Sequence, residues 1–204
     1  MKNKLSMLVA AMSLSVVPML FAADIAKLTE SCTHCHGKDG ASTDTHVPII
    51  GGQPKTYIAN SLKGFKAKER VCPEMAIPTG PQKDTKTDMC KIADALSDDD
   101  VAQLAAFYAG KKFVRSAQNS ADAGLAAKGK EIHKQSCEKC HTDGGTTSAE
   151  DSTIVAGQQM GYLSNSFKEM LSEKRTIDKK MKVKFDDLNR ESIDALIHYY
   201  GSQK

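Results

Sequence analysis

The sequence lacks tryptophan altogether, and aromatic side chains make up only 5% of its 204 residues. A domain of about 90 residues usually depends on large side chains to fill its core, because its surface is large relative to its volume. The scarcity of aromatic residues therefore argues against a core built from them. Part of the core volume would then have to be filled by an apolar group that is not a side chain.

The chain also lacks a strong excess of charge of one sign. It has 28 lysines and arginines against 25 aspartates and glutamates, a formal net charge of +3. Nucleic-acid-binding domains are usually strongly basic or carry clustered lysines and arginines. We therefore expect no nucleic-acid partner.

After residue 22 there is no apolar run long enough to span a membrane. Before it, Lys2 and Lys4 precede an apolar stretch that ends near the small residue Ala22. This order predicts a signal peptide over residues 1–22, cleaved within a residue or two, and export to the periplasm. Its removal lowers the formal charge from +3 to +1. A retained N-terminal anchor is the alternative.

A strand-like alternation of apolar and polar residues is missing as well, so we expect an all-α fold. Ser97 is a good N-cap residue, and Gly110 and Gly201 are expected to end the helices that precede them. Apolar spacing and these signals predict the following helices: Asp24–Cys32, Tyr57–Lys66, Val101–Ala109, Asp122–Cys137, Tyr162–Leu171 and Asn189–Tyr200.

An internal repeat organises the chain. Two pentapeptides, Cys32-Thr33-His34-Cys35-His36 and Cys137-Glu138-Lys139-Cys140-His141, lie 105 residues apart. The same offset maps Gly52-Gln53 onto Gly157-Gln158 and Tyr57 onto Tyr162. We infer a duplicated domain, with boundaries at 23–115 and 116–204 and a polar linker over residues 115–124.

The pentapeptides have the pattern C-x-x-C-H, which is the attachment signature of c-type haem. In this chemistry Cys32, Cys35, Cys137 and Cys140 form thioethers to the porphyrin, while His36 and His141 bind iron. A zinc site built from both cysteine pairs, or a thioredoxin-like redox pair, is the alternative. Zinc ligands usually lie in one compact unit, whereas these pairs lie in separate repeats. We therefore predict two covalent haems, which would also supply the missing core volume.

A methionine opposite the histidine would suit the iron to electron transfer. Met181 lies 20 residues before Gly201, and Met89 lies 21 residues before Gly110. Met75 is the rival of Met89, because it lies 39 residues after His36, close to the 40 between His141 and Met181. The spacing from the histidine favours Met75, whereas the spacing to the glycine favours Met89. The two spacings agree if the first repeat carries about 14 extra residues between Met75 and Met89. We favour Met89, since it leads directly into the last predicted helix of its repeat.

Two further cysteines, Cys72 and Cys90, bracket this insert. In an oxidising compartment they are expected to form a disulfide, and a pair of reactive thiols is the alternative. The remaining histidines are expected to have surface or packing roles rather than to bind iron: His34, His46, His133 and His198.

With these residues in place, the chain resembles the two-domain diheme class I cytochromes c, a group that includes cytochrome c4 and the cytochrome subunit of flavocytochrome c sulfide dehydrogenase. The resemblance covers the mature chain, and its motifs match Met89 and Met181 to the family's iron ligands. It implies two tandem class I domains, each wrapped around a covalent haem.

The resemblance also implies a function. It favours an electron-transfer protein rather than an enzyme, which accepts electrons from a flavoprotein sulfide dehydrogenase subunit and passes them to a respiratory or photosynthetic chain. A free cytochrome c4-type shuttle to a terminal oxidase is the alternative. A diheme peroxidase is disfavoured by the methionine in each repeat. The chain departs from the family pattern at the insert between Cys72 and Cys90, where a partner would dock.

Overall fold

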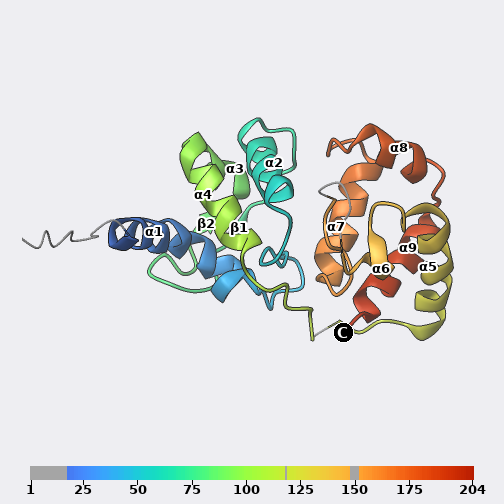
Figure 1. Cartoon of the computed structure of the whole chain (residues 1–204). Coiled ribbons are helices and arrows are strands. Elements are labelled where there is room, and N and C mark those ends of the chain that lie inside the picture. The colour runs from blue at the N-terminus through green and yellow to red at the C-terminus, as the bar shows by residue number, and fades with distance from the viewer. Residues whose placement is uncertain (1–17, 118, 148–151) are drawn as a thin grey trace, which may run out of the picture.

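The computed structural model describes residues 18–117, 119–147 and 152–204, and it is built from two helical halves joined by one crossing of the chain (Figure 1). The predicted signal peptide lies outside the described residues, except for its last five residues, which begin the first helix. The elements of the N-terminal half are α1 (Pro18–His36), η1 (Lys38–Gly40), α2 (Lys55–Lys66), β1 (Met75–Ala76), β2 (Lys86–Thr87), α3 (Met89–Asp94) and α4 (Asp98–Ala109). Those of the C-terminal half are α5 (Ala123–Ser136), α6 (Thr142–Gly145), α7 (Met160–Leu171), α8 (Lys179–Phe185) and α9 (Arg190–Ser202).

The core of the N-terminal half lies where α2 and α1 meet α4. Leu104, Ala105 and Tyr108 of α4 are buried together with Ile58 of α2. The helix α4 begins at a capping box, in which Ser97 and Asp100 satisfy each other's backbone N–H groups. Three acidic residues in the first turn of α4 also interact favourably with the positive end of the helix dipole: Asp98, Asp99 and Asp100. The predicted cap at Ser97 and the helix end at Gly110 are both confirmed.

The C-terminal half is built around the crossing of α5 and α9. Gly129 lies at this crossing, and a side chain there would collide with the backbone carbonyl of Ala195. The two helices therefore approach closely only because this position is a glycine. On the other side of α9, the stacked rings of Phe167 and Phe185 join α7 and α8, with centroids 5.8 Å apart.

Two details differ from the sequence-based expectations. Gly201 does not end the last helix, because α9 continues to Ser202. Gly201 instead packs against the side chain of Met160, so its small size serves a close contact. The insert also contains strands, since β1 and β2 form a two-residue antiparallel ladder that pairs Met75 with Thr87. Strands this short carry no readable alternation. The fold class is nevertheless helical, as predicted.

No helix within the described ranges is long and apolar enough to cross a membrane. The linker lies against the C-terminal half, where the backbone N–H of Ser116 donates to the carbonyl of Gly157 at 2.7 Å.

Candidate functional site

The attachment motif of the N-terminal half lies at the end of α1. Cys32 and Cys35 are outside any disulfide and are partly buried. His36 is buried, and its Nδ1 donates a hydrogen bond to the carbonyl of Pro48 at 2.9 Å. Burial lowers the pKa of His36, so the ring is neutral. With the proton on Nδ1, the lone pair of Nε2 is available to a metal ion.

The C-terminal half repeats this arrangement. Cys137 is the C-cap of α5, and both Cys137 and Cys140 are outside any disulfide and partly buried. The Nδ1 of His141 donates to the carbonyl of Thr153 at 2.7 Å. Burial lowers the pKa of His141 too. Pro48 and Thr153 are themselves related by the 105-residue offset, so the element that orients each histidine is part of the repeat.

A cavity of about 790 Å³ brings several of the predicted residues together. It is lined by Cys137, Cys140, His141 and Met181, among others. A methionine and a histidine thus share one cavity with the two thiols of the same motif.

The two predicted methionine ligands occupy matching places in the sequence of the two halves. Met89 begins α3 and lies eight residues before Ser97, the N-cap of α4. Met181 lies in α8, eight residues before Asn189, the N-cap of α9. Met75 lies in β1 on the other side of the insert.

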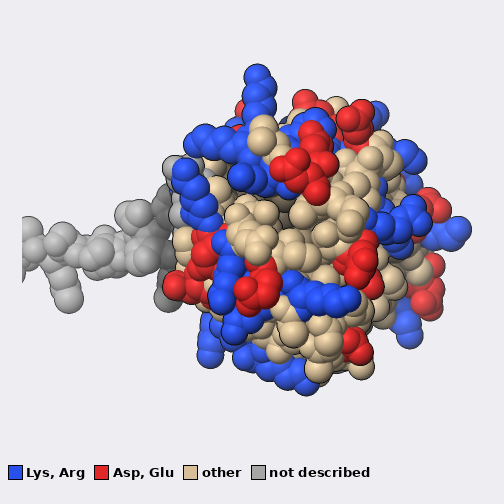
Figure 2. Space-filling model, turned by 90° about the vertical axis from the view of Figure 1, so that its right-hand side faces the viewer, with Lys and Arg blue, Asp and Glu red and all other residues tan. Residues whose placement is uncertain are grey.

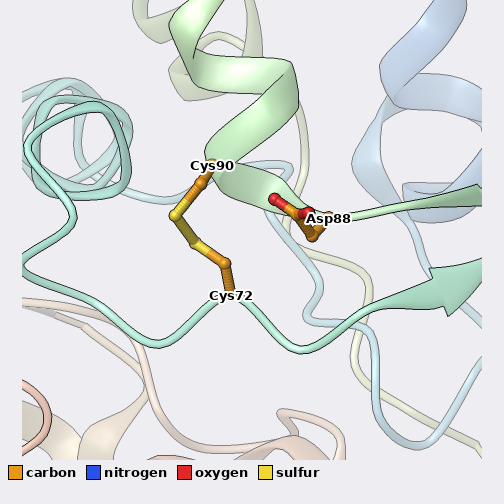
Figure 3. Close-up of side chains that lie close together, drawn as sticks. All are labelled: Cys72, Asp88 and Cys90. Atoms are coloured by element: carbon orange, nitrogen blue, oxygen red, sulfur yellow. A yellow bond between two sulfur atoms is a disulfide. The ribbon is translucent and has the colours of Figure 1, made fainter.

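The structure joins Cys72 to Cys90 in a disulfide with a Cα–Cα distance of 5.7 Å (Figure 3). This bond ties the start of the insert to the second residue of α3. Asp88 lies beside it, but its carboxylate caps α3 by accepting from the N–H of Lys91. Because both sulfurs are bonded to each other, the three residues do not form a metal-ion site.

The two halves are joined by reciprocal glutamines. Gln53 accepts from the N–H of Ile154 and donates to the carbonyl of the same residue, both at 2.9 Å. Gln158 does the same to Ile49, at 2.8 and 2.9 Å. Ile49 and Ile154 directly follow Pro48 and Thr153, whose carbonyls orient the two histidines. Each half therefore holds the histidine loop of the other.

A second cluster across the junction contains tyrosines and arginines. The hydroxyls of Tyr57 on α2 and Tyr162 on α7 lie 3.3 Å apart, where the two helices face each other (Figure 1). Burial alone would raise the pKa of Tyr162, but the guanidinium groups of Arg175 and Arg70 lower it to about 7. The Nε of Arg70 and the Nη1 of Arg175 are buried without a hydrogen-bond partner in the described structure.

These features fit a haem. Arg70 and Arg175 line the same cavity as Cys137, Cys140 and His141. Buried, unpaired guanidinium N–H groups are costly unless an anion accepts from them, and a haem carries two carboxylates. The cavity therefore offers the groups that a haem needs. These are two cysteines for covalent attachment, the imidazole of His141, the sulfur of Met181, and two guanidinium groups to pair with the haem carboxylates.

The sequence predicts the cysteines, histidines and methionines as site residues, but it gives no role to Arg70, Arg175 and the glutamines. A signal was present, since Arg70 and Arg175 obey the 105-residue offset, as do the glutamines. His133 was expected on the surface or in packing. It is buried, and its two ring nitrogens bond to Tyr200 and Glu138.

Comparisons with known proteins agree with this geometry. The Cytochrome c family model matches residues 22–109. Cytochrome c-554(548) from Halomonas halodenitrificans is 30% identical over 82 residues, which cover 40% of this chain and 86% of that protein. Cytochrome c4 from Stutzerimonas stutzeri is 25% identical over 204 residues, covering 92% of this chain and 93% of that protein.

The fold matches a solved structure as well. The crystal structure of reduced recombinant cytochrome c4 from Pseudomonas stutzeri gives a TM-score of 0.70 at 24% identity, covering 90% of this chain and 98% of that one. The chain belongs to the cytochrome c family, as a two-domain diheme class I cytochrome with two covalently bound haem c groups. It is an electron-transfer protein of the cytochrome c4 type rather than an enzyme.

Proposed function

We propose that this protein is a periplasmic electron shuttle of the cytochrome c4 kind, which takes electrons from one redox protein and delivers them to another, such as a terminal oxidase. The observation that supports this most directly is the pair of matching attachment sites joined through one buried junction. Two redox centres held in a fixed relation by the same residues suit a carrier that moves electrons within itself. The predicted signal peptide over residues 1–22 supports export.

We assign each predicted site residue a role. The haem irons, when bound, take up and release single electrons. Cys32, Cys35, Cys137 and Cys140 would form the thioether bonds to the haems, and His36, His141, Met89 and Met181 would supply the ligands of the two irons.

The chain's own residues orient these ligands. The carbonyls of Pro48 and Thr153 hold the proton on Nδ1 of each histidine, which keeps the other nitrogen free for iron. Arg70 and Arg175 place positive charge in the cavity at the junction, where it would balance the carboxylates of a bound haem.

Met89 is the better candidate for the N-terminal ligand than Met75. Its eight-residue distance from the cap of the last helix equals that of Met181. The neighbouring disulfide at Cys90 also fixes the start of α3, on which Met89 lies. Met75 lies instead in β1, at the other end of the insert.

A free shuttle is favoured over a subunit of a flavoprotein sulfide dehydrogenase, because the relative that matches over more than nine tenths of its length is a cytochrome c4. The surface supports transient partners. Basic and acidic side chains are interspersed on the outer face of the C-terminal half (Figure 2). A surface of mixed charge gives little steering toward a single, strongly charged partner.

Purification of the native protein under mild conditions tests this choice. We expect the haem absorbance to elute at the size of the chain alone, without flavin, and the reduced protein to be reoxidised by membranes that contain a terminal oxidase. A stoichiometric FAD that co-elutes with the haem, and that dissociates only on denaturation, would instead identify a flavoprotein subunit.

A further inference from the structure

The C-terminal half has a polar trio beside its attachment motif, made of a buried histidine, a buried tyrosine and a partly exposed glutamate. His133 of α5 is 0% exposed, and its Nδ1 lies 3.0 Å from the hydroxyl of Tyr200 on α9. Its Nε2 lies 2.5 Å from Oε2 of Glu138, which is the residue after Cys137 in the motif. The N–H of Gly144 also donates to this carboxylate, at 3.3 Å. Both ring nitrogens therefore have partners.

Among its described residues, the N-terminal half has no such trio. The 105-residue offset places Leu28 opposite His133 and Thr33 opposite Glu138. Tyr200 does have a counterpart in Tyr108. The carbonyl of Tyr200 accepts from the N–H of Gly157 at 2.8 Å, and the carbonyl of Tyr108 accepts from the N–H of Gly52 at the same distance. The two glycines are themselves related by the 105-residue offset. The histidine and the carboxylate are thus additions to a shared frame, made in one half only.

We propose that His133 and Glu138 form a proton-binding site coupled to the oxidation state of the haem on Cys137 and Cys140. This inference rests on the proposed attachment of that haem. In one state the neutral imidazole donates from Nε2 to Glu138 and accepts from the Tyr200 hydroxyl at Nδ1. In the other state a proton occupies Nδ1, and the hydroxyl oxygen accepts instead. Each state satisfies both ring nitrogens, so the charge of the ring changes by one while Nδ1 and Nε2 keep their partners.

The proton has a route to solvent. The side chain of His133 is 1% exposed, whereas that of Glu138 is 41% exposed. The carboxylate therefore connects the buried ring with water.

Coupling follows from electrostatics. Reduction adds one electron, supplied by the redox partner or an electrode, to the iron. A proton taken from solvent onto the nearby buried ring offsets that added negative charge, and inside the protein this attraction is weakly screened. The proton is therefore bound more tightly in the reduced state. The potential of this haem should fall as pH rises through the window where the site titrates, and should level off on either side.

Other groups around the pair do not take this role. Tyr199 and Tyr200 face it from α9, and burial raises the pKa of both, so they stay protonated at neutral pH. Asp143 of α6 accepts from Thr147. His141 acts on the pair only electrostatically, and its Nδ1 proton is held by Thr153.

The test is the potential of each haem as a function of pH, measured by spectroelectrochemistry on the full-length holoprotein and its His133→Leu and Glu138→Gln variants. His133→Leu reproduces the residue found at Leu28. The C-terminal haem is identified as the one whose potential moves in Met181→His. For one electron coupled to one proton, the haem potential can fall by at most about 59 mV for each unit rise in pH.

We expect a pH-dependent potential for the C-terminal haem in the wild type, and a loss of that dependence in both variants, with the N-terminal haem unchanged. A flat wild-type profile, or a slope that survives in both variants, would overturn the inference. If His133→Leu does not fold, Glu138→Gln decides, because its side chain is partly exposed. A haem count on the same samples separates the two proposals: one haem per wild-type chain contradicts the attachment, whereas two haems with an unaltered slope contradict only the proton site.

Discussion

The two halves of this cytochrome share a frame and differ in what surrounds it. In both, an α-helix leads into the attachment motif, and a backbone carbonyl twelve residues after the histidine orients its ring. Near the methionine, the N-terminal half carries a disulfide-bonded insert, whereas the C-terminal half has α8. Beside the motif, the C-terminal half has a buried histidine bonded to a partly exposed glutamate, whereas the matching positions of the N-terminal half are Leu28 and Thr33. The frame therefore serves the attachment of haem, while the surroundings can give two haems of one chain different properties.

The halves are also not independent. Gln53 and Gln158 each bond the histidine loop of the opposite half. A substitution in one half can therefore alter the geometry of the iron ligands in the other half.

The largest expected effect is the loss of one haem. Replacing Cys137 and Cys140 together by Ser should leave one haem per chain and unfold much of the C-terminal half, because its cavity would lose the group that fills it. Replacing Cys32 and Cys35 is the matched control and should remove the other haem. Haem content and helical circular dichroism measure both. Two haems remaining in either variant would refute the assignment.

Exchange of an iron ligand should have the next largest effect. Met89→His and Met181→His should each weaken the long-wavelength absorbance band of methionine ligation in the oxidised protein and lower one of the two potentials, because a second imidazole favours the oxidised iron. Met75→Leu should leave both unchanged. Loss of half the band in Met75→Leu would place the N-terminal ligand on the other side of the insert.

Removal of the disulfide should affect the N-terminal half alone. The bond closes a loop with a sequence separation of 18, which contributes about 3 kcal/mol in the chain-entropy model. Replacing Cys72 and Cys90 by Ser should therefore make Met89 easier to displace by added imidazole, as followed by absorbance. Met181 is the internal control. Equal displacement at both haems, or free thiols at positions 72 and 90 in fresh native protein, would contradict this account.

The smallest of these effects concerns the junction. Gln53→Ala removes two hydrogen bonds to Ile154, and leaving such buried groups unpaired costs about 1–3 kcal/mol. Chemical denaturation should show a loss of this size. Gln158→Ala should match it by symmetry. Gln103→Ala, which affects only an exposed bond to Asp99, should change little. A loss in Gln103→Ala as large as that in the other two would show that the junction glutamines have no special role.

Much of this architecture was predictable from the sequence, because the attachment motif is specific and the 105-residue offset repeats it. The helices that carry the motifs were predictable from apolar spacing. The strands β1 and β2 were not, since two residues show no alternation. Gly201 was misread as a helix end because a glycine that relieves a packing contact looks the same in a sequence as one that ends a helix.

The polar residues of the interior were harder to predict. Arg70 and Arg175 belong to a residue type that is almost always solvated, yet one guanidinium nitrogen of each is buried in the cavity lined by both halves. His133 precedes its motif by four residues on a helix, a position that indicates packing. Its contacts with Glu138 and Tyr200 depend on how α5 meets α9, which no local pattern reveals.

The most direct test of the central claim is the covalent haem content of each half. The purified holoprotein should be extracted with acid–acetone, digested without reduction, and its haem peptides identified by mass spectrometry. We expect no haem in the extract and two haem-bearing peptides, one containing Cys32 and Cys35 and the other Cys137 and Cys140. Haem released into the extract, or only one modified peptide in the intact protein, would contradict the account of two matching sites.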